Sequence, residues 1–429
     1  MVQQAKVLSS SLGARQLSTE ATSIKELRDD EPNDVVFESK YGLRTVMLNR
    51  PKKLNSLNAS MIRKIVPRLV EWEKSDLANV VVMKGAGEKS LCAGGDVAAL
   101  AHLNQQEDGW KKSAEYFALE YKLDHYIATY QKPYIAFMDG ITMGGGVGLS
   151  AHAPFRIATE KTVFAMPETT IGFFPDARLA ELRFRDSDDL PARLALINET
   201  LEEFCTGLPY DQPMALSGEI RRAIDRCFNK NTISDIIAAL ESERGATEEW
   251  AQKQIKTLHK RSPTAVHVAL RQMRVGGEWD IAETFKKEHQ ISSKFMQHPD
   301  FTEGVTALLI RKETPKWSPE SLEDIATKDN VTKPFFEFDP KSDIELFTDR
   351  TYSEYPHQSL GVPTEKEIRK VLSDGSYSQE ELANIIIASR RGRQGISEVV
   401  KEIIARKTDV DARGKARWLA DESTPGSKL

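Results

Sequence analysis

Short apolar runs with the length and composition of β-strands recur through the first part of the chain, and stretches of helical spacing separate most of them. The strand-like runs are residues 35–37, 45–48, 80–83, 134–138 and 163–166. Residues 59–74 instead place Ile62, Ile65 and Leu69 at helical intervals, and a second helical stretch covers residues 110–123. Strands that alternate with helices predict an α/β fold in which helices bury the sheet.

The pattern changes at about residue 190, where helical spacing takes over and strand-like runs stop. After a Pro-rich, charged and aromatic stretch, Thr364 and Ser378 each open an S/T-x-x-E capping box, which predicts two helix starts. The sequence therefore divides into a leader (1–19), a linker (20–34), a core (35–189), a helical cap region (190–325), an extended connector (326–362) and a basic helical extension (363–429).

The leader carries Lys6 and Arg15, is rich in Ser, Ala, Leu and Gln, and has no acid before Glu20. This composition favours a mitochondrial transit peptide over a terminus without a targeting role. A secretory signal is disfavoured because no continuous apolar region is present. No apolar run in the chain approaches the length of a membrane span, so none is expected.

Metal and disulfide chemistry is not favoured by the residue pattern. The three cysteines, Cys92, Cys205 and Cys227, lie far apart without CxxC spacing, and the eight histidines form no recognisable ligand motif. Cys92 is expected to be a small buried residue, not a nucleophile, because no motif supplies a partner histidine.

The C-terminal extension concentrates positive charge. Between Arg390 and Arg417 the sequence has nine basic residues and four acidic ones, within a chain whose net charge is −5. Such a segment can bind RNA phosphates through counterion release. Because the acids are interleaved with the bases, a solvated helical surface is an equally good interpretation.

Two glycine-rich turns follow buried strands, at residues 92–96 and 140–146. Glycines there let the backbone approach a ligand closely, and two backbone N–H groups aimed at one point form an oxyanion hole. Ordinary tight turns are the alternative. A dinucleotide loop is disfavoured because Leu149 and Ala151 stand where the last glycine of GxGxxG belongs, and the chain has no GxxxxGK[ST] phosphate loop.

A pair of carboxylates, Glu168 and Asp176, flanks the apolar stretch Ile171-Gly172-Phe173-Phe174. Apolar surroundings raise the pKa of a carboxyl group and make it useful as a base or acid near neutral pH. Asp96, by contrast, is expected to cap the helix that follows it, since aspartate is favoured at that position.

Four motifs in this order resemble the crotonase superfamily: Leu48-Asn49-Arg50-Pro51, Ala93-Gly94-Gly95-Asp96, Gly144-Gly145-Gly146 and Pro167-Glu168-Thr169-Thr170-Ile171-Gly172. The resemblance covers residues 35–325. It implies an α/β fold of the ClpP/crotonase-like type, a ββα superhelix core followed by helices. It also implies that the N–H groups of Gly95 and Gly145 form the oxyanion hole. The basic extension lies outside the resemblance and is similar to one seen in fungal members.

The position two residues after the triple glycine separates the subfamilies. Enoyl-CoA hydratases carry a glutamate there, whereas this chain has Gly148, so hydration by two glutamates is disfavoured. Gly148 with Glu168 and Asp176 resembles the 3-hydroxyisobutyryl-CoA hydrolases of valine breakdown. That resemblance implies thioester hydrolysis in the mitochondrial matrix, in which Glu168 attacks the carbonyl or activates a water and Asp176 orients the substrate hydroxyl or assists proton transfer. CoA is then part of the substrate, and no metal or redox cofactor is expected.

One departure from the subfamily follows Asp176. The chain continues directly into Ala177-Arg178-Leu179, which resembles a stretch found several tens of residues later in the family, so an internal block is expected to be missing. Such a block would build one wall of the acyl pocket. A non-enzymatic alternative also stands, because some fungal relatives are components of the mitochondrial ribosomal small subunit. Crotonase relatives frequently form trimers or hexamers, so a homo-oligomer is a further expectation.

Overall fold

The computed structural model describes residues 23–174, 190–203, 205, 214–325 and 331–419. A hairpin opens the fold, as the sequence predicts: β1 (Val35–Lys40) runs antiparallel to β2 (Leu43–Leu48). Three parallel strands extend this sheet in the order β1-β2-β3-β5-β7, with β3 at Val80–Gly85, β5 at Tyr134–Met138 and β7 at Phe155–Ala158. The α/β class is therefore confirmed.

A second, smaller parallel sheet carries the loops of interest. It has the order β4-β6-β8, formed by β4 (Ser90–Cys92), β6 (Ile141–Met143) and β8 (Val163–Ala165). Each strand ends just before one of the three motifs identified in the sequence. Because the strands are parallel, their carboxyl ends lie at one edge of the sheet, and the three motifs meet there.

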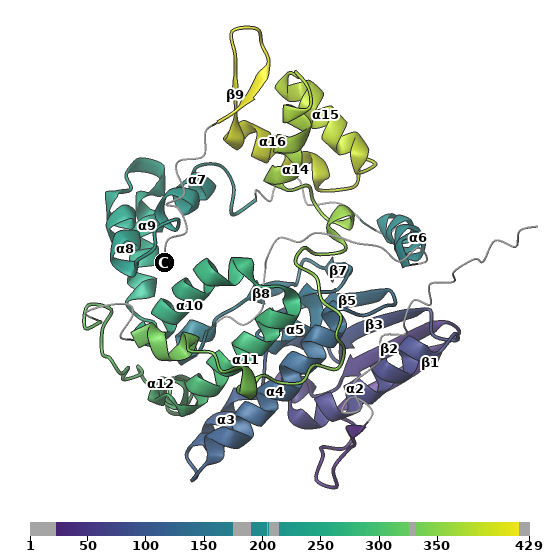
Figure 1. Cartoon of the computed structure of the whole chain (residues 1–429), viewed down its shortest axis with the longest axis vertical. Helices are drawn as coiled ribbons and strands as arrows, with labels where there is room; N and C mark the ends of the chain where they lie inside the picture. Colours follow the sequence, from purple (N-terminus) through teal and green to yellow (C-terminus); the bar gives the residue numbers. More distant parts are fainter. Residues whose placement is uncertain (1–22, 175–189, 204, 206–213, 326–330, 420–429) are drawn as a thin grey trace, which may run out of the picture.

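Helices α2 (Ala59–Lys74) and α5 (Gly145–Ala151) pack on these sheets, and α3 (Val97–Asn104) and α4 (Gly109–Ala128) pack with other helices of the core. The predicted helix at residues 59–74 is α2, with an Asn58 side-chain cap and Ile62, Ile65 and Leu69 buried. The long helix α4 packs along α11 (Ile281–Gln297), which joins the core to the cap region (Figure 1).

The cap region is helical, as predicted. Its helices are α6 (Leu190–Glu202), α7 (Gly218–Cys227), α8 (Ile233–Ser242), α9 (Glu248–Leu258), α10 (Pro263–Val275), α11 and α12 (Pro299–Val305). Helices α7, α8 and α9 share a separate apolar core that includes Cys227, Ile236 and Leu240. Helix α6 instead lies on the larger sheet, where Leu194 packs with Val82 and Ile135.

The segment expected as an extended connector is irregular, but it also contributes to the core. Phe335 and Phe347 are buried in the main apolar cluster. Arg350 donates two hydrogen bonds to the Glu73 carboxylate of α2, at 2.7 and 2.8 Å, and its carbonyl contacts His125 Nε2 of α4 at 2.9 Å. The connector thus ties two core helices together.

The C-terminal extension forms a small unit with its own apolar core. It comprises α14 (Glu365–Ser373), α15 (Gln379–Ser389), α16 (Ile396–Lys407) and the hairpin of β9 (Thr408–Val410) and β10 (Ala416–Trp418). Both predicted capping boxes, at Thr364 and Ser378, are present. Among the described residues, no helix is long and apolar enough to cross a membrane.

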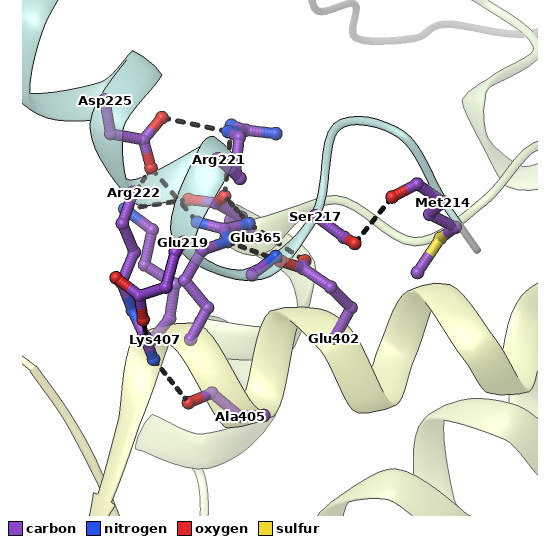
Figure 2. A network of polar contacts seen from close by, with 12 residues as sticks. Met214, Ser217, Glu219, Arg221, Arg222, Asp225, Glu365, Glu402, Ala405 and Lys407 are labelled. Atoms are coloured by element: carbon purple, nitrogen blue, oxygen red, sulfur yellow. Dashed lines mark hydrogen bonds and ion pairs between the residues drawn. The ribbon is translucent and has the colours of Figure 1, made fainter. Parts of the chain in front are cut away.

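Ion pairs attach the extension to α7. The Arg406 guanidinium, with 3% of its side chain exposed, pairs with Glu365 at 2.7 Å, Glu402 at 2.9 Å and Asp225 of α7 at 3.2 Å. Figure 2 shows Asp225 of α7 close to Glu365 and Lys407 of the extension, and Lys407 pairs with both. We call Asp225, Glu365, Glu402 and Arg406 the clasp.

The extension also holds α6. Arg391 pairs with Glu199, Arg393 donates to the Asn198 side chain at 2.9 Å, and Glu202 accepts a hydrogen bond from the Gln394 backbone at 2.8 Å. Figure 1 shows α7 to the left and α6 to the right, with the helices of the extension between them at the top of the view. The extension therefore bridges the helix that covers the sheet and the first helix of the cap bundle.

Candidate active site

The structure brings Gly95, Gly145 and Glu168 to one cavity of about 420 Å³. Gly95 lies in the loop after β4, Gly145 begins α5, and Glu168 begins the short 3₁₀ helix η2 (Glu168–Ile171). The rest of the lining is mainly apolar; it includes Val97, Phe117, Ile171, Phe173, Leu308 and Leu309. Three residues predicted from separate motifs thus line the same cavity.

Backbone conformation explains the glycines at this site. Gly94 has φ 105° and Gly144 has φ 47°, values that side-chain-bearing residues rarely adopt. The two loops also touch: a Cβ placed on Gly144 would lie 3.2 Å from the Cα of Gly94. Glycine at both positions therefore lets the loops that carry Gly95 and Gly145 approach each other. Their role as an oxyanion hole stays a prediction.

Glu168 is buried beside the second loop. Its side chain is 7% exposed, and Oε1 lies 3.1 Å from the position of a Cβ on Gly144. The Glu168 carbonyl accepts a hydrogen bond from the Phe173 backbone at 2.9 Å, which fixes the turn at Gly172. The carboxylate therefore reaches the space between the glycine loops. Asp176, the second predicted acid, lies outside the described residues.

A second carboxylate in the cavity escaped the sequence analysis. Glu120 of α4 lines the cavity and is 2% exposed, and a Cβ placed on Gly145 would lie 3.3 Å from its Cδ. The sequence feature that could have identified Glu120 is its position on the apolar face of a predicted helix, three residues after Phe117 and three before Leu123. A carboxylate at such a position needs a partner or a function.

Position 148 has no room for a side chain. A Cβ placed on Gly148 would lie 2.7 Å from Cγ and 2.8 Å from Oδ1 of Asp124, the residue one turn after Glu120 on α4. Asp124 is itself buried. Helix α4 therefore places Glu120 in the cavity wall and Asp124 against Gly148.

The structure also bears on the expectations for Cys92 and Asp96, which flank the first glycine-rich turn. Cys92 is fully buried, and burial raises the pKa of its thiol to about 12, as expected for a residue that is not a nucleophile. Asp96 stands at the N-cap position of α3, as predicted, but its side chain makes no capping hydrogen bond. Its carboxylate accepts from Arg50 at 2.9 Å and Lys53 at 3.2 Å instead, because hydrogen bonds to two cations are stronger than one to a backbone amide. Burial opposes ionisation, but these cations hold the pKa of Asp96 below its usual value.

The basic residues of the extension are largely neutralised within the chain. Seven of the nine between residues 390 and 417 have side-chain partners in the described part of the structure: Arg390, Arg391, Arg393, Arg406, Lys407, Lys415 and Arg417. Several partners, including Glu199 and Asp225, belong to the cap region. Ion pairs from Arg391, Arg406 and Lys407 thus connect the extension to the cap region, and the other ion pairs lie within the extension. No group of three His, Cys, Asp or Glu residues that could hold a metal occurs among the described residues.

Comparison with known proteins gives consistent matches. A family model described as Enoyl-CoA hydratase/isomerase matches residues 43–182 and 177–336. The 3-hydroxyisobutyryl-CoA hydrolase, mitochondrial, of Gallus gallus is 36% identical over 352 residues, which cover 71% of this chain and 90% of that protein. Small ribosomal subunit protein mS47 of Neurospora crassa is 48% identical over 451 residues, covering 91% of this chain and 89% of that protein. The crystal structure of a carnitinyl-CoA dehydratase from Mycobacterium thermoresistibile superposes with a TM-score of 0.60 at 31% identity, over 73% of this chain and 98% of that one.

Proposed function

Since the chain belongs to the enoyl-CoA hydratase/isomerase family, we propose that it hydrolyses the thioester of 3-hydroxyisobutyryl-CoA in the mitochondrial matrix, as a step of valine breakdown. The observation that carries this proposal is the convergence of Gly95, Gly145 and Glu168 on one cavity. A cavity of about 420 Å³ with an apolar wall suits a short acyl group. CoA enters as part of the substrate, and no cofactor is required.

The chemistry follows from the placement of these groups. The thioester oxygen accepts hydrogen bonds from the N–H groups of Gly95 and Gly145, which stabilise the negative charge that develops as the carbonyl is attacked. Glu168 either attacks the carbonyl carbon or takes a proton from the attacking water. The carbon–sulfur bond then breaks, and the sulfur of CoA takes up a proton. If a water attacked, the hydroxy acid is released directly. If Glu168 attacked, the acyl group is left as an anhydride on Glu168, and a water hydrolyses that anhydride to release the hydroxy acid and restore the carboxylate.

Glu120 gives the cavity a second carboxylate. We assign it the recognition of the substrate hydroxyl, a role that the sequence analysis gave to Asp176. A buried carboxylate that accepts a hydrogen bond from the substrate hydroxyl discriminates against an acyl chain without the hydroxyl, because that hydrogen bond is then not made. Asp176 remains a candidate for proton transfer.

Hydrolysis is favoured over hydration by the surroundings of position 148. Hydration in this family uses a glutamate there, whereas the Asp124 carboxylate fills that space in this chain. The test is a pair of assays on the purified protein. Free thiol is measured with 3-hydroxyisobutyryl-CoA, and loss of the double bond is measured with crotonyl-CoA. The proposal requires thiol release from the first and no hydration of the second.

The proposed missing block has support from the comparisons. The family model matches in two segments that meet at residues 177–182. The alignment with the Neurospora protein spans 451 residues, more than the 429 of this chain, so that relative carries residues that this chain lacks. Both observations are what a missing stretch just after Asp176 would produce.

A second candidate function is a place in the small ribosomal subunit of the mitochondrion. The relative named for that subunit matches 91% of this chain, against 71% for the hydrolase of Gallus gallus. Because the unmatched 9% is shorter than residues 363–429, the match includes part of the extension. The two functions are compatible, since α4 and α5, which contribute to the cavity lining, lie apart from α14, α15 and α16 of the extension (Figure 1).

Contact between the extension and ribosomal RNA would depend on its remaining basic side chains. Lys401 and Arg413 are exposed and have no side-chain partner in the described part of the chain. Co-sedimentation of the full chain with mitochondrial ribosomes tests the association. If Lys401→Glu with Arg413→Glu reduces it while Arg417→Leu does not, RNA contact through the extension is supported. Absence of the wild-type chain from the ribosomal fraction would contradict the ribosomal function.

A further inference from the structure

We propose that Tyr116 is a positioning residue that joins the two candidate oxyanion-hole loops through a hydrogen bond to Glu120. The inference rests on the proposed function, because it concerns the same cavity. Tyr116 of α4 is buried and does not line the cavity itself. Its hydroxyl lies behind the cavity wall, between the Gly95 loop on one side and Glu120 on the other.

On the first side, Tyr116 contacts the loop that carries Gly95. A Cβ on Gly95 would lie 2.8 Å from the Tyr116 hydroxyl, so the phenol fills the space next to that glycine. The hydroxyl also lies 3.2 Å from the carbonyl oxygen of Leu57. The Leu57 backbone in turn accepts from the Asp96 N–H and donates to the Gly94 carbonyl, both at 2.8 Å. Tyr116 therefore supports a backbone network that encloses Gly95.

On the second side, Tyr116 is hydrogen-bonded to Glu120, one helical turn later on α4. The Glu120 carboxylate lies against Gly145, where a Cβ would be 3.3 Å from its Cδ. A continuous line of contacts thus runs from Gly95 through Tyr116 and Glu120 to Gly145. The two N–H donors come from loops about fifty residues apart in sequence, and this line of contacts fixes the distance between them.

The direction of the Tyr116–Glu120 hydrogen bond follows from its surroundings. Burial, followed by the negative charge of Glu120, raises the pKa of Tyr116 well above its usual value, so the hydroxyl stays protonated. A hydroxyl has one proton to donate, and a carboxylate is a stronger acceptor than the Leu57 carbonyl at 3.2 Å. Tyr116 therefore donates to Glu120 and favours its ionised form.

Two consequences distinguish this role from ordinary packing. Without the hydroxyl, Glu120 holds its proton more tightly, so the acid side of the pH–rate profile moves to higher pH. The distance between the Gly95 and Gly145 loops is also less well fixed, which affects the transition state more than substrate binding. The predicted change is therefore in kcat and in the pH profile.

The experiment compares Tyr116→Phe with Tyr126→Phe in the full chain. Tyr126 is a matched control, because it lies on the same helix and its hydroxyl donates to a glutamate, Glu73, at 2.9 Å. For hydrolysis of 3-hydroxyisobutyryl-CoA, we expect Tyr116→Phe to lower kcat about tenfold with little change in KM. We also expect the acid limb of the pH–rate profile of Tyr116→Phe to move to higher pH by about one unit. Tyr126→Phe should change neither. If both variants have the wild-type kcat and pH profile, the proposal is overturned.

A binding experiment distinguishes failure of the proposed hydrolase function from failure of the proposal for Tyr116. Binding of a non-hydrolysable thioether analogue of 3-hydroxyisobutyryl-CoA is measured by calorimetry from pH 5 to 8. If the wild-type chain binds the analogue but releases no CoA from the thioester, the hydrolase function fails and the binding data decide the role of Tyr116. A shifted pH dependence of binding in Tyr116→Phe supports the role, and curves that coincide with the wild type overturn it. A wild-type chain that binds no analogue overturns both.

Discussion

The carboxylate of Asp124 occupies the space in which a side chain at Gly148 would begin. A Cβ on Gly148 would lie 2.7 Å from Cγ of Asp124. Because the two residues belong to α4 and α5, this contact sets how closely the helices pack beside the cavity. It also leaves no room for the glutamate that the resemblance to enoyl-CoA hydratases would place at position 148.

We predict that Gly148→Glu destabilises the protein and does not confer hydratase activity. Overpacking of a buried position costs about 1–3 kcal/mol, and the new carboxylate would also meet the charge of Asp124. Thermal unfolding and a crotonyl-CoA hydration assay measure the two effects. Adding Asp124→Gly should recover part of the lost stability. Equal melting temperatures for wild type and Gly148→Glu would show that the two residues do not compete for space.

We predict that Arg406→Leu weakens the attachment of the extension without changing turnover at the cavity. The substitution removes the buried cation shared by Asp225, Glu365 and Glu402. Because Asp225 and Glu365 are partly exposed and keep Lys407 as a partner, we expect a cost of about 1–2 kcal/mol. Limited proteolysis should show earlier cleavage near the extension. The control is Arg417→Leu, which removes an exposed pair with Asp409 and should behave as wild type. Identical proteolysis of the two variants would contradict the clasp.

Glu243 makes the stability of the cap region depend on acid pH. Hydrogen bonds from Arg226, despite the opposing effect of burial, and a further one from Thr247 lower the pKa of Glu243 to about 2. The resulting stabilisation is present above the unfolded-state pKa of about 4.3 and is lost as pH falls toward 2. Because Arg226 is partly exposed, we expect the contribution to be about 1–2 kcal/mol.

Denaturant unfolding of wild type and Glu243→Gln between pH 7 and pH 2 checks this prediction. The variant should be less stable at pH 7, and the difference should disappear at low pH. A constant difference across this range would mean that the charge of Glu243 contributes nothing.

Restoring the proposed missing block should increase both activity and stability. The corresponding stretch of the Neurospora relative would be inserted after Asp176. We expect the longer chain to melt at a higher temperature and to have a higher kcat, because the block would support the Asp176 loop and complete a wall of the acyl pocket. Equal turnover and equal melting temperature for the two chains would refute the prediction.

Much of the fold could be predicted because the signals are local. The helix at residues 59–74 and the capping boxes at Thr364 and Ser378 depend on spacing within one segment. Gly95, Gly145 and Glu168 were found because each lies in a short motif after a strand. That they share one cavity follows from parallel strands that end at the same edge of a sheet.

The features that were missed depend on contacts between distant residues. Asp96 binds Arg50 and Lys53, more than forty positions earlier, so a rule for local helix caps gave the wrong partner. The basic residues of the extension were weighed only against acidic residues in the same segment, whereas Asp225, a partner of Arg406, belongs to α7. Glu120 carries no motif, and its place in the cavity depends on how α4 packs against α5.

The most direct test of the account is release of free thiol from 3-hydroxyisobutyryl-CoA by wild type, Glu168→Gln and Glu160→Gln. Glu160 is exposed and serves as the control. We predict thiol release by the wild type and by Glu160→Gln, and a loss of at least about 100-fold in Glu168→Gln at an unchanged melting temperature. Wild-type turnover by Glu168→Gln, or no release by a wild-type chain that binds the thioether analogue, would contradict the hydrolase function.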